Sequence, residues 1–97
     1  MKPDDFLKCI ANKNRRDILI FLKDKERCVC EFEQELGLEQ SLVSHHLKLL
    51  KCCGIVTSNH KGKNIYYKLT NKEVCALLKK IETISKKFEN TGECVRK

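Results

Sequence analysis

Polar side chains that can bind nucleic acid recur at helical spacing in the middle of the chain. A helix turns by about 100° per residue, which gathers four of them on one narrow face: Ser41, Ser44, His45 and Lys48. The opposite face repeats the spacing with Val43, Leu47 and Leu50. Hydroxyl, imidazole and ammonium groups are those that reach base edges and phosphates in the major groove. The spacing therefore predicts an amphipathic helix over residues 39–50 whose polar face suits DNA.

The distribution of charge favours the same interpretation. The 97 residues carry a net charge of +7, but residues 1–40 carry a net −1 and residues 73–97 a net +2. Residues 41–72 contain six lysines and no acidic side chain. An acid-free window that begins with the polar-faced helix is typical of a polyanion-binding surface. The alternative is an ordinary solvated basic face.

Two of the seven cysteines, Cys28 and Cys30, have a spacing that can serve a soft ion. In a reducing compartment, cysteines act as thiols, metal ligands or redox sensors more often than as structural disulfides. Residues two apart on a regular helix point in nearly opposite directions, so a shared ion requires Cys28 to fold back at the helix start. The helix N-terminus and Arg27 favour the thiolate there, and soft ions prefer thiolate ligands.

The other cysteines carry weaker signals. Cys52 and Cys53 are adjacent, which makes them poor chelators, and we expect Cys53 to be buried. Cys75 falls early in the last expected helix, and Cys94 in the tail is a free thiol open to oxidation. A redox switch through one of these thiols is an alternative to metal sensing.

Apolar spacing and turn residues place the polar-faced helix in a larger motif. A first helix begins near Pro3, and a second covers about residues 14–23. A third covers about residues 29–36 and ends at Gly37, which can adopt a positive φ. Two short helices joined by a tight turn that contains glycine make a helix-turn-helix, here over about residues 29–51.

A β-hairpin is expected directly after this motif. Residues 55–58 and 65–69 are rich in branched and aromatic side chains, and the segment between them has turn residues. A hairpin in this position is a wing, over about residues 55–69. Lys61 and Lys63 at its tip are placed to contact phosphate or a minor groove. An ordinary surface hairpin is the alternative.

The last helix, over about residues 71–89, carries an apolar seam with a period near seven residues. Asn71 or Thr70 can cap its start. One small domain does not have enough surface to cover such a seam, so we expect a partner helix and a homodimer. The alternative is that the seam packs on its own domain.

Several segments resemble the ArsR/SmtB family of winged-helix repressors over about residues 4–89. They are Arg15–Leu19, Cys28–Phe32, Leu36–Leu38, Gln40–Lys48 and Tyr66–Leu69. The resemblance implies a mostly α fold with a small β-hairpin, in the order α-α-α-α-β-β-α. It also implies a homodimer that represses transcription at a pseudo-palindromic operator, and in many members a metal or metalloid releases the DNA. We expect release by a soft metal, a metalloid or thiol oxidation.

The resemblance also assigns residues. The groove-facing positions are Gln40, Ser41, Ser44, His45 and Lys48, whereas His46 is a half-buried packing residue. The first and last helices form the dimer interface, through Phe6, Ile10, Leu77, Leu78, Ile81, Ile84 and Phe88.

Cys28 and Cys30 match a Cys-Val-Cys that arsenic- and cadmium-sensing members use. The third cysteine of the arsenic pattern is Glu33 here, and Cys9 can complete the site instead. The family's other sensor site uses histidines on the last helix, and this chain has none after His60. The alternative is a cysteine pair that only packs.

Other function classes find little support in the sequence. No Gly-rich phosphate loop, Ser/His/Asp set or paired carboxylates indicate an enzyme, so we expect no small-molecule substrate and no required cofactor. No apolar run approaches the roughly 20 residues that span a bilayer, and the first residues lack the apolar core of a signal peptide. We therefore expect one cytoplasmic domain over residues 1–97. A metal- or thiol-handling protein on a winged-helix scaffold and an RNA-binding winged helix are the alternative functions.

Overall fold

The computed structural model describes residues 1–88, so Cys94 and residue 89 of the expected last helix lie outside the described residues. Within them the elements are α1 (Pro3–Ile10), α2 (Lys13–Phe21), β1 (Arg27–Cys28), α3 (Val29–Leu36), α4 (Gln40–Cys52), β2 (Val56–Lys61), β3 (Asn64–Leu69) and α5 (Glu73–Lys86). The expected winged helix-turn-helix, mostly α with one β-hairpin, is confirmed.

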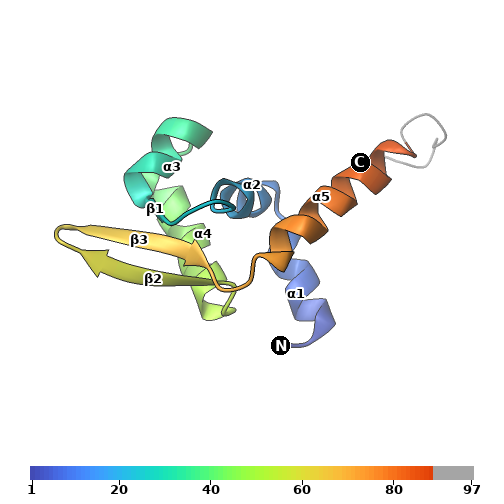
Figure 1. The fold of residues 1–97 in the computed structure, drawn as a ribbon, viewed down its shortest axis with the longest axis horizontal. Helices are drawn as coiled ribbons and strands as arrows, with labels where there is room; N and C mark the ends of the chain where they lie inside the picture. Colours follow the sequence, from blue (N-terminus) through green and yellow to red (C-terminus); the bar gives the residue numbers. More distant parts are fainter. Residues whose placement is uncertain (89–97) are drawn as a thin grey trace.

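The helices are arranged around α2 (Figure 1). The α3 and α4 helices lie on one side of it, and α1 and α5 lie on the other. The β2–β3 hairpin extends outward from the side of α3 and α4, whereas α5 extends toward the opposite end of the molecule. The hairpin and α5 are therefore free to contact different partners.

The sheet contains a third strand that the sequence did not reveal. Its order is β1-β3-β2, with both pairs antiparallel. Arg27 pairs with Tyr67, and Cys28 pairs with Tyr66. We expected no helix or strand between residues 23 and 29, because two residues are too few to show an alternating pattern. The strand fixes Cys28 beside the middle of β3.

The helices begin and end close to where the sequence indicated. Asn12 caps α2 by accepting a hydrogen bond from the Arg15 N–H at 3.1 Å, so α2 begins at Lys13. Gly37 ends α3 with φ 67°. Asn71 lies one residue before Lys72, the N-cap of α5, and accepts from the Glu73 N–H at 2.8 Å.

The core gathers side chains from all five helices and the hairpin. Ile10 and Leu78, which we expected at a dimer interface, are each only 4% exposed and belong to this core. This corrects the expected interface, since burial within the protomer leaves these side chains little surface for a partner. Cys75 also belongs to this core, and its thiol donates to the Leu19 carbonyl at 3.3 Å. No helix of the described residues is both long and apolar enough to cross a membrane.

Candidate nucleic-acid interface

The α4 helix presents two different faces. Val43, Leu47 and Leu50 are completely buried, and α4 packs against α3 and β2. The buried face holds α4 in one orientation, because turning it would expose all three apolar side chains to water. The direction of the opposite face is therefore fixed by the core.

The polar face of α4 lies at the surface. Four of the residues expected to face DNA are exposed and one, Ser44, is half-buried: Gln40, Ser41, Ser44, His45 and Lys48. Lys51, one turn beyond Lys48, is exposed and donates to the Ser58 hydroxyl at 2.7 Å. The two serine hydroxyls, the imidazole and the ammonium groups can thus reach a ligand laid along this face.

His46 differs from His45 in its surroundings. It is 5% exposed, more deeply buried than the half-buried position that we expected. Its Nδ1 lies 3.5 Å from Nη1 of Arg15, a residue of α2. Burial lowers the pKa of His46, and the charges of Arg15 and His45 lower it further. His46 therefore favours its neutral form and links α4 to α2.

A cleft of about 340 Å³ joins the polar face to the cysteine pair and the wing. It is lined by Cys28, Cys30, Gln40, Ser44, Lys48 and Lys63, with five further residues. Cys28 ends β1, Cys30 lies in the first turn of α3, and Lys63 comes from the hairpin turn. Anything bound by the cysteines therefore lies beside side chains expected to contact DNA.

The two cysteines of this cleft are close together. The Cys28 backbone is extended, with φ −79° and ψ 153°, and the Sγ atoms of Cys28 and Cys30 lie 3.1 Å apart. The N–H of Cys28 donates to the Glu31 carboxylate at 2.8 Å, which holds the turn in place. The expected folding back of Cys28 at the helix start is thus present.

Cys30 favours the protonated thiol. The hydrogen bond to Cys28, followed by burial and the charges of Cys28 and Glu31, raises the pKa of the Cys30 thiol. A soft ion that binds here must displace thiol protons, so its affinity rises with pH.

No third ligand is assembled beside the pair within one protomer. The described residues contain no group of three or more His, Cys, Asp or Glu side chains placed to hold a metal ion. Cys9, which we expected to complete the site, instead has its Sγ 2.7 Å from that of Cys53, at the end of α4. The cysteine pair matches the ligand preference of a soft ion, but it is an incomplete donor set.

The two lysines of the wing differ. The ammonium group of Lys61 is paired with the Glu26 carboxylate and lies 5.3 Å from the centre of the Tyr66 ring. No ion pair among residues 1–88 involves Lys63, which lines the cleft. We expected the same DNA contact from both lysines, because nothing in the local sequence shows that Glu26 lies beside the hairpin.

The comparison with known proteins settles the family. The model of the bacterial regulatory proteins of the arsR family matches residues 12–58. The chain is 30% identical over 94 residues to the arsenical resistance operon repressor of Bacillus subtilis (strain 168), a match that covers 96% of this chain and 90% of that protein. The chain belongs to the ArsR family. It is therefore a member of a family of regulatory proteins and not of enzymes.

Two further proteins are similar to this chain. It is 37% identical over 67 residues to the HTH-type transcriptional repressor SmtB of Mycobacterium tuberculosis (strain ATCC 25618 / H37Rv), covering 69% of this chain and 50% of that protein. It thus spans about half the length of that relative. A homodimeric winged helix-turn-helix DNA-binding domain from Mycobacterium bovis has the same fold, with a TM-score of 0.71, 25% identity and coverage of 92% of this chain and 82% of that one.

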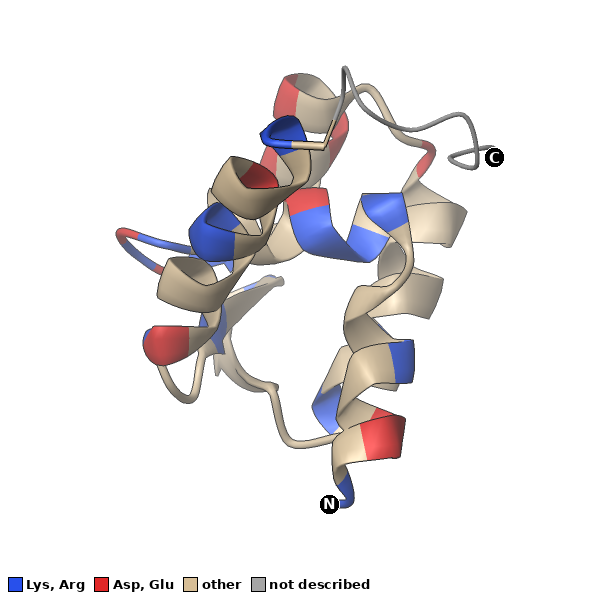
Figure 2. Cartoon of the chain, turned by 90° about the vertical axis from the view of Figure 1, so that its right-hand side faces the viewer, with Lys and Arg blue, Asp and Glu red and all other residues tan. Residues whose placement is uncertain are grey.

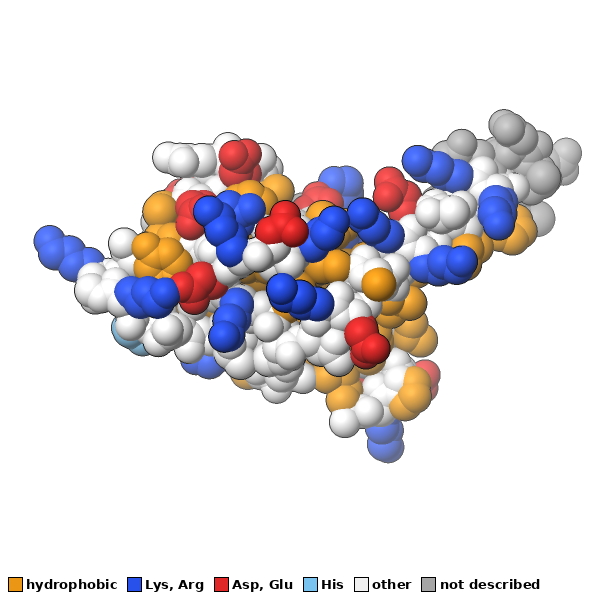
Figure 3. Space-filling view, viewed as in Figure 1, with side chains coloured by type: hydrophobic (Ala, Val, Ile, Leu, Met, Phe, Trp, Pro, Cys, Tyr) orange, Lys and Arg blue, Asp and Glu red, His pale blue; other side chains and the backbone are white. Residues whose placement is uncertain are grey.

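An apolar surface on this ArsR-family chain lies away from the cleft. Figure 3 shows hydrophobic side chains between α1 and α5. Four large side chains on α5 and just beyond its end are 37–57% exposed: Leu77, Ile81, Ile84 and Phe88. Leu7 of α1 and Ile20 of α2 are also exposed, at 55% and 43%. We did not expect Ile20 at this surface. Ile18, Leu19 and Ile20 are consecutive on one helix, so they cannot all face the core; Ile18 and Leu19 are buried, and Ile20 faces outward.

The α1 and α5 helices border this surface, and α2 lies between them (Figure 2). Lysines and acidic residues alternate along α5 in this view, so the apolar side chains are flanked by charges of both signs. An apolar strip with a charged border is typical of a protein–protein interface.

Proposed function

We propose that this ArsR-family chain is a transcriptional repressor that binds a pseudo-palindromic operator in duplex DNA as a homodimer. The observation that supports this proposal most is the orientation of α4, whose buried face directs Ser41, His45 and Lys48 outward. A recognition helix must project short polar groups into the major groove from a fixed support. Residues 41–72, which include most of α4 and all of the wing, supply the positive charge without an acidic side chain.

A homodimer follows from the exposed apolar side chains of α5, with Phe6 and Leu7 of α1 beside them. Two copies related by a two-fold axis present two α4 helices to the two halves of a palindromic site. The M. bovis domain of similar fold is homodimeric and binds DNA by its description. We place the protein in the cytoplasm and assign it no required cofactor.

Release from DNA is assigned to the cysteine pair. A soft metal or metalloid held by Cys28 and Cys30 lies in the cleft that also contains Gln40, Ser44 and Lys48. It would change the charge and the shape of the surface that meets DNA. The relatives described as arsenic- and cadmium-resistance regulators support this class of inducer. Further ligands must come from another protomer or from solvent.

The proposed function is tested by selecting duplexes from a random pool with the full chain and measuring their affinity by fluorescence anisotropy. The proposal expects a selected sequence with two-fold symmetry, bound by two chains. Structured RNA serves as the competitor. Preferential binding of RNA, or binding of every duplex with equal affinity, would contradict the proposal.

A further inference from the structure

A second pair of thiols joins two helices that are distant in the sequence. Cys9 lies in the last turn of α1, and Cys53 follows the last residue of α4, 44 residues later. Their Sγ atoms are 2.7 Å apart, and both side chains are half-buried. Because a disulfide bond is about 2.05 Å long, the sulfur atoms need to approach by only about 0.7 Å to form one. We propose that Cys9 and Cys53 form a reversible disulfide that links α1 to the end of α4, with a peroxide as the oxidant.

The backbone holds both residues in place. The Arg15 guanidinium donates to the Cys9 carbonyl at 2.7 Å and to the Lys8 carbonyl at 3.1 Å. The Cys53 N–H donates to the Leu49 carbonyl at 3.1 Å. These bonds fix the chain on either side of the sulfur contact, so the two thiols meet without a rearrangement of the helices. The Cys28–Cys30 pair is less suited to a disulfide. These two residues are only two positions apart, so a bond between them would close a small ring within a single helical turn.

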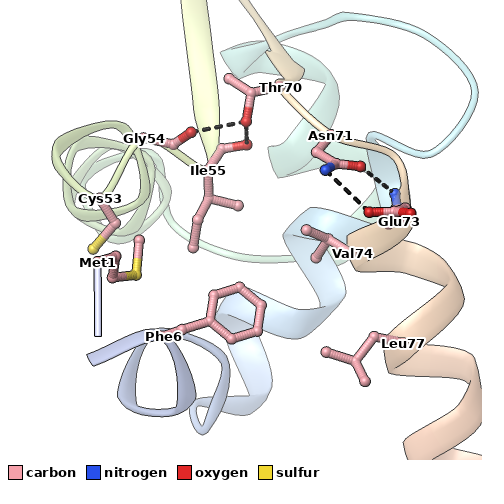
Figure 4. A pocket seen from close by; sticks show the side chains of 10 residues that line it. All are labelled: Met1, Phe6, Cys53, Gly54, Ile55, Thr70, Asn71, Glu73, Val74 and Leu77. Atoms are coloured by element: carbon pink, nitrogen blue, oxygen red, sulfur yellow. Dashed lines mark hydrogen bonds between the residues drawn. The ribbon is translucent and has the colours of Figure 1, made fainter. Parts of the chain in front are cut away.

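An oxidant can reach Cys53 through a cavity of about 360 Å³ (Figure 4). Cys53 lines its α4 side, and Phe6 of α1 and Leu77 of α5 lie across it. Burial and the hydrogen bond with Cys53 raise the pKa of the Cys9 thiol to about 11, so Cys9 is protonated at neutral pH. We therefore assign the first attack to Cys53.

The chemistry balances with one peroxide for each disulfide. The Cys53 thiolate attacks a peroxide oxygen, the O–O bond breaks, and Cys53 becomes a sulfenic acid as one water leaves. The Cys9 sulfur then attacks the Cys53 sulfur. The S–S bond forms, and the displaced hydroxyl takes the proton of Cys9 and leaves as a second water. A dithiol reductant reverses the bond by thiol–disulfide exchange.

The test is peptide mapping of the full chain after treatment with hydrogen peroxide and alkylation of the remaining thiols. Trypsin cuts after Lys8, Lys13, Lys51 and Lys61, so the linked product joins residues 9–13 to residues 52–61. We expect this product in the wild type and in Cys52→Ser, its loss in Cys53→Ser, and its removal by dithiothreitol. Cys52 is the matched control, because it is the exposed neighbour of Cys53 on the same peptide.

A mixture of isotopically light and heavy chains shows whether the bond lies within one chain. Linked peptides of mixed isotope composition would overturn the proposal, as would a link through Cys52 or a Cys28–Cys30 disulfide as the main product. The oxidised wild type should also melt at least about 5 °C above the reduced protein, because the link closes a long loop. A lower melting temperature would also overturn it. None of these measurements involves DNA, so their failure leaves the proposed function untouched.

Discussion

The ammonium group of Lys61 on β2 is paired with the carboxylate of Glu26, 35 residues earlier in the chain. Lys63, only two residues further on, lines the cleft beside Lys48 and has no such partner among residues 1–88. A contact between Lys61 and a DNA phosphate must compete with the Glu26 carboxylate. The two lysines at the wing tip should therefore contribute differently to DNA binding.

Lys63→Ala should weaken the binding of all duplexes alike and flatten the dependence of log K on log salt by up to about one unit. Lys61→Ala should have a smaller effect on both quantities. Glu26→Gln should increase affinity, because it releases Lys61. Anisotropy titrations at several salt concentrations measure all three variants. Equal losses for the two lysine variants would show that the ion pair does not persist in the complex.

Cadmium or arsenite should lower the affinity of the wild type for duplex DNA, and Cys28→Ser/Cys30→Ser should abolish this response. The physical reason is that the cysteine pair and the DNA-facing side chains share one cleft. The response to cadmium should strengthen as the pH rises, because the pKa of Cys30 is raised and its proton must leave. Cys52→Ser is the control and should respond like the wild type. A metal-handling protein would bind the ion with no change in DNA affinity.

The stability of the fold should fall as the pH drops below about 6.5, the ordinary pKa of histidine. The pKa of His46 is lowered by burial and by the charges of Arg15 and His45, so the unfolded chain binds a proton more readily than the folded one. This contribution is present above pH 6.5 and is lost as the pH falls through the lowered pKa of the folded state. Denaturant unfolding between pH 5 and 8 measures it. His46→Leu should reduce the dependence of the unfolding free energy on pH, whereas His60→Gln should not. An equal pH dependence in the wild type and both variants would refute the assignment to His46.

Ile81→Glu/Ile84→Glu should convert a dimer into a folded monomer. Both side chains are exposed on α5, at 37% and 42%, so the substitutions leave the protomer core intact. Sedimentation velocity measures the mass, and circular dichroism reports the fold. Thr83→Glu is a control for a carboxylate on the same helix, since Thr83 is exposed and its hydroxyl donates to the Lys79 carbonyl within α5. A wild type that sediments as a monomer would contradict the proposed dimer.

The elements that carry a periodic pattern could be predicted from the sequence. The faces of α4 follow from helical spacing, and the wing follows from two β-prone segments around Gly62. The two-residue strand β1 could not be predicted, because it forms only where β3 offers an unpaired edge.

The contacts between distant residues were also beyond sequence reasoning. The Cys9–Cys53 and Lys61–Glu26 pairs depend on how whole helices and strands pack, and no local spacing encodes them. The same limit explains why Ile10 and Leu78 were expected at the dimer interface although they belong to the core of the protomer. An apolar seam shows which side chains avoid water, but it does not show whether the cover is the chain's own core or a second copy.

The proposed role of α4 is tested most directly by the affinity of Ser44→Ala/His45→Ala for the selected duplex, compared with Cys52→Ser on the same helix. We expect a loss of about 1–3 kcal/mol for each base contact removed, with an unchanged sedimentation coefficient and an unchanged affinity for unrelated duplexes. The control should bind like the wild type. Wild-type affinity of the double variant for the selected duplex would contradict the assignment of this face to DNA.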